Sequence, residues 1–153
     1  MPDGQPVSDS SWRQRGAAML EFAIVLPLLL VLLFGIIEAA WAFNQQLEVR
    51  HGAREGARLV AVNAGTDLIV AGEVRDRMHF SGDVDATGVT IGTSGTAIGD
   101  TATITIQAPY TGLTGFLDAI FSGSTLTSIV EIRLEQVPQA NLGTGTPVLC
   151  GSV

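Results

Sequence analysis

The pattern of apolar and polar residues divides the chain into a polar start, a long helical stretch and a region of strands. No charged residue occurs from Phe22 to Ile37, and apolar residues continue on both sides of this run. At about 1.5 Å per residue the run covers roughly 24 Å, slightly less than a hydrocarbon core. With its apolar flanks it predicts a transmembrane helix over residues 17–43.

Helical periodicity continues beyond this predicted span. No proline occurs between residues 44 and 63, and Arg50, Arg54 and Arg58 recur every four residues on one face. Another face collects the apolar residues Leu47, Ala53, Ala57, Val60 and Ala64. We therefore expect one helix over about 17–63.

After residue 80 the pattern changes to the alternation that is typical of β-strands. Residues 101–107 and 126–137 alternate clearly, and residues 87–91 more weakly. A second short helix at 67–78 precedes them. We expect an antiparallel sheet of three or four strands whose inner face includes Ile104, Ile106, Val130 and Ile132.

These elements predict an α+β fold in which the upper half of a long N-terminal helix packs on a small antiparallel sheet. Arg13 and Arg15 precede the apolar run, so the positive-inside rule places the N-terminus in the cytoplasm. The expected parts are a disordered cytoplasmic leader at 1–16, a transmembrane helix at 17–43, an extracytoplasmic α+β domain at 44–137 that continues the helix, and a flexible Gly/Thr/Pro-rich tail at 138–153.

Composition excludes several classes of function. The net charge is −7, and all eight basic residues are arginines. A P-loop and a Schiff-base enzyme each need a lysine, and a nucleic-acid-binding protein needs a basic stripe. His51 and His79 are too few for most metal sites or for a catalytic triad. We expect no enzyme, no cofactor, no metal site and no nucleic-acid partner.

Two smaller features have limited meaning. Asp83 and Asp85 imitate the first half of a calcium loop, but the twelfth position from Asp83 is Ser94 and not the bidentate glutamate that such loops use. Cys150 is the only cysteine and cannot form an intrachain disulfide.

Two glutamates border the apolar run, Glu21 and Glu38. A carboxylate at the bilayer centre costs about 2.5–3.5 kcal/mol on insertion scales. A transmembrane span that includes either residue therefore needs an interaction that offsets this cost. We expect Glu38 to lie at the membrane interface. The row of Arg50, Arg54 and Arg58 is interpreted as a solvated helix face, or alternatively as a contact with another subunit or with anionic headgroups.

The segment Arg-Gly-Ala-Ala-Met-Leu-Glu-Phe-Ala-Ile-Val-Leu-Pro at 15–27 closely resembles the start of TadE-like proteins, which are minor pilins or pseudopilins of tight-adherence (Flp-type) pilus systems. The resemblance continues through Phe-Gly-Ile-Ile-Glu at 34–38 and ends in Ala53-Arg54-Glu55-Gly56-Ala57-Arg58, which is similar to the second signature of that family. It implies a type IV pilin-like fold and a role in pilus assembly and adhesion. The implied partners are a prepilin peptidase, the major pilin and other minor pilins, the inner-membrane assembly platform and membrane lipid.

The resemblance also implies a processing site. Prepilin-type signals have a basic leader that ends in glycine and a glutamate as the fifth residue after the cut. The cut would fall between Gly16 and Ala17, which makes Glu21 and Phe22 the fifth and sixth residues of the mature chain. Glycine suits the position before the cut because the absent Cβ lets a peptidase approach the backbone.

Cleavage would also provide a partner that offsets the free-energy cost of placing the Glu21 carboxylate in the membrane. In related pilins this glutamate is thought to pair with the N-terminal amine of a neighbouring subunit, which here would be the amine of Ala17. The residues leave open whether the protein enters the fibre, caps its tip or stays at the membrane.

Two other functions compete with this interpretation. The first is a secreted protein that is cut after Ala42. Ala40-Trp41-Ala42 follows an apolar run and is similar to the A-x-A site of a conventional signal peptide. The second is a single-pass anchored domain that is never processed.

Overall fold

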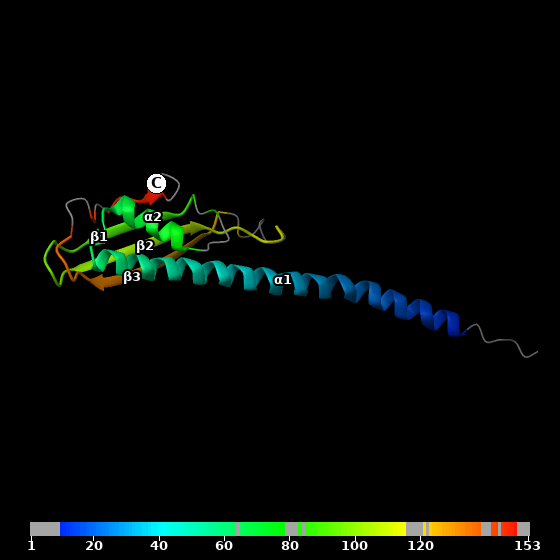
Figure 1. The fold of residues 1–153 in the computed structure, drawn as a ribbon. Helices are drawn as coiled ribbons and strands as arrows, with labels where there is room; N and C mark the ends of the chain where they lie inside the picture. Colours follow the sequence, from blue (N-terminus) through cyan, green and yellow to red (C-terminus); the bar gives the residue numbers. More distant parts are fainter. Residues whose placement is uncertain are drawn as a thin grey trace, which may run out of the picture. The chain divides into compact units, whose positions relative to one another are not determined.

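A computed structural model of the chain describes residues 10–63, 65–78, 83, 85–115, 121, 123–138, 142–143 and 145–149. The predicted leader falls partly, and His79 and Cys150 fall wholly, outside the described residues. The elements, labelled in Figure 1, are α1 (Ser10–Ala61), α2 (Asp67–Arg77), β1 (Gly88–Thr93), β2 (Thr101–Pro109), β3 (Thr125–Arg133) and β4 (Val148–Leu149).

The chain forms two compact units, Met1–Ile37 and Glu38–Val153. The described part of the first unit is the N-terminal part of α1. The second unit contains the rest of α1, together with α2 and all four strands.

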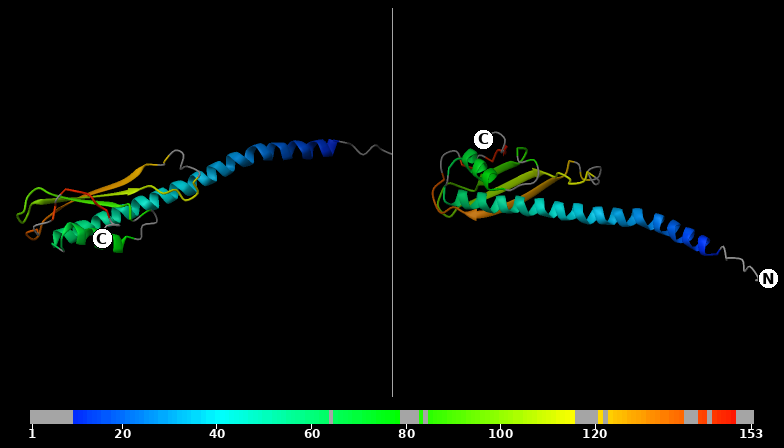
Figure 2. Two further views of the ribbon diagram at one scale, coloured as in Figure 1. Left: turned by 90° about the horizontal axis from the view of Figure 1, so that it is seen from above. Right: turned by 45° about the vertical axis from the view of Figure 1, so that its right-hand side comes forward.

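The strands form one antiparallel sheet in the order β3-β2-β1-β4, which Figure 2 shows from two directions. Ile104 pairs with Val130, and Ala102 pairs with Ile132, so these side chains share one face. The expected inner face is confirmed, because Ile104 and Ile106 are fully buried and Val130 and Ile132 pack against the core.

The core of the second unit lies between this face of the sheet and the two helices. On α1 the buried apolar residues recur at three- and four-residue steps, which keeps them on the side that faces the sheet. Leu47, which was expected on this face, is instead 61% exposed. The buried residues include Val49, Ala53, Ala57 and Val60 of α1, Val70 and Val74 of α2, and Val89, Ile91, Ile104 and Ile106 of the sheet. The predicted α+β fold, with a long N-terminal helix packed on a small antiparallel sheet, is confirmed.

The ends of α1 differ from the sequence prediction. The helix begins at Ser10 and not at 17, so residues 10–15, expected to be disordered, are helical. No proline or glycine lies between Ser10 and Arg15, and Gly16 weakens a helix without ending it. The helix ends at Ala61 and the chain then turns at Asn63, whose φ of 53° is a left-handed conformation that asparagine tolerates.

The register of β3 gives a first testable prediction. Ile132→Asp is expected to lower the free energy of unfolding by about 2–3 kcal/mol, because it places a carboxylate against the apolar core. Ile129 lies on the opposite face of the same strand and is 62% exposed, so Ile129→Asp is the matched control. Denaturant unfolding of the detergent-extracted chain measures both. Equal losses for the two variants would mean that the faces of β3 are assigned wrongly.

Candidate functional site

The apolar part of α1 exposes its side chains. A helical segment from Gly16 to Ala61 is long and apolar enough to cross a membrane, with a mean hydropathy of 2.8 in its most apolar window. None of that window is buried in the protein. A soluble protein rarely exposes a large continuous apolar surface. A helix near the N-terminus with this exposure fits a single-pass membrane anchor.

The predicted processing residues all lie on this exposed helix. Gly16, Ala17, Glu21 and Phe22 are exposed, and Phe22 has 64% of its surface accessible. A Cβ atom built on Gly16 would meet no described atom within 4 Å. The predicted cut therefore lies within the helix, on a side where no described atom from outside the helix packs against Gly16. Arg13 and Arg15 precede it within α1.

The second signature of the sequence, residues 53–58, joins α1 to the rest of its own domain. Ala53 and Ala57 are buried in the core. A Cβ atom at Gly56 would lie 3.1 Å from Cγ2 of Val74, so the missing side chain lets α2 approach α1 closely. Glu55 forms an ion pair of 3.2 Å with Arg77 of α2.

The remaining members of this signature, Arg54 and Arg58, have a different environment. Both are exposed, and no ion pair of either is found among the described residues. The signature therefore combines a packing surface for α2 with arginines that point away from the core.

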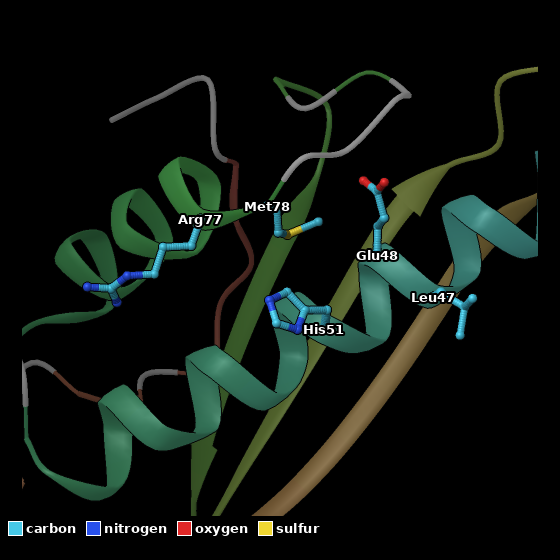
Figure 3. Close-up of a pocket in the computed structure, with 5 residues that line it drawn as sticks. All are labelled: Leu47, Glu48, His51, Arg77 and Met78. Atoms are coloured by element: carbon cyan, nitrogen blue, oxygen red, sulfur yellow. The ribbon is translucent and has the colours of Figure 1, made fainter.

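One turn before this signature, α1 and the end of α2 border a cavity of about 370 Å³. Figure 3 shows His51 of α1 and Met78, which follows α2, pointing into the space between the two helices. Glu48 lies nearby, and its Oε1 accepts a hydrogen bond of 3.3 Å from Asn44. Gly52 lies against Met78, because a Cβ atom there would be only 2.8 Å from Cγ of Met78. Two small residues, Gly52 and Gly56, thus lie where Met78 and Val74 approach α1 closely.

Glu38, which was expected at a membrane interface, has its side chain buried inside the second unit. Only 1% of Glu38 is exposed. Its Oε1 accepts hydrogen bonds from the Tyr110 hydroxyl at 2.8 Å and the Leu113 amide at 3.1 Å. Its Oε2 accepts hydrogen bonds from the amide and the hydroxyl of Thr114 at 3.1 and 2.7 Å. A carboxylate that only accepts hydrogen bonds has the pattern of the ionised form.

Further contacts hold the same segment, residues 110–114, to α1. Gln45 donates a hydrogen bond of 2.6 Å to the Thr111 carbonyl and accepts one of 3.3 Å from the Thr111 amide. Trp41 donates to the same carbonyl at 3.0 Å. We call Glu38, Trp41, Gln45 and residues 110–114 the Glu38 clamp. It consists of residues that are far apart in the sequence, so periodicity alone could not reveal it.

Asp83 and Asp85, the residues that imitate a calcium loop, have local structural partners. Asp83 accepts a hydrogen bond of 3.1 Å from the Ala86 amide, as in a tight turn. Asp85 forms an ion pair of 3.1 Å with Arg75. These contacts place the two carboxylates at a turn before β1 and at the side of α2.

Comparison with known proteins supports the resemblance found in the sequence. The family model described as TadE-like protein matches residues 16–58. No curated protein and no solved structure matches the chain. The matched segment begins at the predicted cleavage glycine and ends at Arg58, so it contains the second signature and all of the first except Arg15.

Proposed function

Because residues 16–58 match the TadE-like family, a family of pilus components, and α1 fits a single-pass anchor, we propose that the chain is a minor pilin or pseudopilin. It acts in the assembly of a tight-adherence (Flp-type) pilus. The family match carries this proposal, and the exposed apolar helix within the matched segment supports it. The protein lies in the cell (inner) membrane as a single-pass protein.

Its topology follows from the charges beside the span. Arg13 and Arg15 hold the N-terminus in the cytoplasm, and the domain that follows the span lies outside the cytoplasm. In this position α1 contacts membrane lipid along its apolar part. The protein meets the inner-membrane assembly platform there, and the major pilin and the other minor pilins.

A prepilin peptidase cuts the chain between Gly16 and Ala17. Water adds across this peptide bond, which leaves a carboxylate on Gly16 and a new α-amine on Ala17. No described atom from outside the helix packs against Gly16, which supports the approach of a peptidase to this turn of α1. Because the cut lies before the apolar run, the mature chain keeps its anchor.

Glu21 then acts in assembly. In the membrane its carboxylate pairs with the Ala17 amine of a neighbouring subunit, which removes the cost of an isolated charge in lipid. Phe22 follows Glu21 and is largely exposed, so it is available for contact with a neighbour.

The contacts of the Glu38 clamp oppose the signal-peptide alternative. A cut after Ala42 would remove Glu38 and Trp41, which together accept or donate five hydrogen bonds with residues 110–114. It would also divide α1 in its interior. A conventional signal peptide has no such role in the mature fold. The unprocessed single-pass anchor remains the other alternative.

The assembly role of Glu21 is tested with Glu21→Gln. This variant keeps the shape of the side chain and removes its charge, so we expect normal cleavage but about tenfold less co-purification with the major pilin. Glu48→Gln, on the same helix beyond the apolar run, is the matched control and should co-purify normally. Normal co-purification of Glu21→Gln would contradict the proposed charge pair.

A further inference from the structure

One side of α1 in the second unit is uncovered and has two chemically different ends. Its residues are spaced by three or four, which keeps them on one side of a helix. All of them are exposed, whereas Val49 and Val60 of the same helix are buried against the sheet. We call this surface the α1 ridge, and it consists of Phe43, Leu47, Arg50, Arg54 and Arg58.

The lower end of the α1 ridge is apolar. Phe43 and Leu47 have 71% and 61% of their surfaces exposed. Phe43 also borders an apolar groove of about 410 Å³, whose other lining residues include Ala42 and Leu126. Phe43 beside this groove and the exposed Leu47 one turn later offer a contact for apolar side chains of a partner.

The upper end of the α1 ridge is strongly cationic. It carries three of the eight basic residues of a chain with a net charge of −7. The ion pairs found among the described residues use Arg75 and Arg77, and none uses an arginine of the ridge. Like charges four residues apart weaken a helix. The helix dipole accounts only for Arg58, which is in the last turn, and not for Arg50 or Arg54.

The arrangement of charges selects the class of partner. An in-register second copy of the same ridge would place arginine against arginine, which disfavours self-association through this face. Arg58 follows Phe43 by fifteen residues, which is about 22 Å of helix. Attraction by anionic headgroups falls off within about 8 Å at physiological ionic strength, so a membrane at the Phe43 end does not explain Arg54 and Arg58. A protein partner with carboxylates does explain these arginines, because guanidinium groups pair with carboxylates in bidentate geometry.

We infer that the α1 ridge binds an acidic helix of a different pilus subunit, with carboxylates against Arg50, Arg54 and Arg58 and apolar side chains against Phe43 and Leu47. The inference rests on the proposed function for the membrane anchor and for the class of partner. It does not depend on cleavage at Gly16. The two ends of the ridge have different roles. The apolar end provides contact area, and the arginines determine which partner binds and in which register.

The test uses photocrosslinking of the full chain in the cells that produce it. Benzoylphenylalanine is incorporated at position 47, within the ridge, or at position 98 as a control, because Ile98 is 68% exposed in the loop between β1 and β2. We expect an adduct from position 47 that maps to a helical segment of another protein with carboxylates at three- or four-residue spacing. The combined variant R50E/R54E/R58E should reduce its yield about tenfold, whereas Arg133→Glu, an exposed arginine on β3, should not.

A charge-swap experiment completes the test. Replacing the mapped carboxylates by arginine should restore the adduct of the triple variant. The inference is overturned by an adduct with a second copy of this chain, by an adduct with lipid alone, by a yield that the triple variant does not change, or by no adduct. Thermal unfolding and membrane fractionation of each variant check folding and anchoring. A chain that is folded, anchored and cut at Ala17 but gives no adduct overturns the ridge alone and leaves the proposed function intact.

Discussion

Glu38→Ala is expected to weaken the attachment of residues 110–114 to α1 and to lower the thermal midpoint of the detergent-extracted chain by at least about 5 °C. The carboxylate accepts four hydrogen bonds, so its removal leaves the donors of Tyr110, Leu113 and Thr114 without their partner. A buried donor that loses its acceptor costs more than the net value of the hydrogen bond that was made. Limited proteolysis should show a new cleavage within 110–115.

Glu48→Ala is the matched control for this prediction. Glu48 lies on the same helix, and one side-chain hydrogen bond, from Asn44, is found for it among the described residues. Glu38→Gln should give an intermediate loss, because one amide oxygen still accepts hydrogen bonds while the amide nitrogen meets donors. If Glu38→Ala and Glu48→Ala unfold at the same temperature, the Glu38 clamp does not stabilise the domain.

Gly16→Val is expected to abolish processing altogether. A β-branched side chain next to the scissile bond blocks the close approach that glycine allows. The uncut chain keeps Arg13 and Arg15 and never exposes the Ala17 amine, so the pairing proposed for Glu21 cannot form. Intact mass measurement of the membrane-extracted protein should show the full leader in this variant and a shortened chain in the wild type.

Gly35→Val is the control for Gly16→Val. Gly35 lies on the same helix, and a Cβ atom there would also meet no described atom within 4 Å. We expect this variant to be cut normally, because only its position relative to the predicted junction differs. A Gly16→Val chain that still begins at Ala17 would show that the peptidase does not need glycine at this site.

The sequence predicted those features of the fold that depend on local periodicity. Alternation along 126–137 assigned Val130 and Ile132 to the buried face, since a one-residue shift would have exposed both. The four-residue spacing of Arg54 and Arg58 placed them together on an exposed helix face. Both predictions use only neighbours within two or four residues.

The features that the sequence did not reveal depend on contacts between distant residues. Glu38 and Thr114 are brought together by the fold, and the sequence around Glu38 gave only the cost of a charge near lipid. The strand β4 has two residues, and Val148 pairs with Val89 in a segment that composition describes as a loose tail. The packing role of Gly56 likewise depends on Val74, a residue of α2 that lies against it.

The mature N-terminus of the wild-type protein tests the central claim most directly. The measurement is the intact mass of the protein extracted from the membrane of its own cells, with sequencing of the first residues. A pilin-type subunit processed by a prepilin peptidase begins at Ala17, with Glu21 as its fifth residue. A chain that begins at Phe43 would be a secreted protein that has lost a signal peptide, and a chain that keeps residues 1–16 would be an unprocessed anchor; either result would contradict the account.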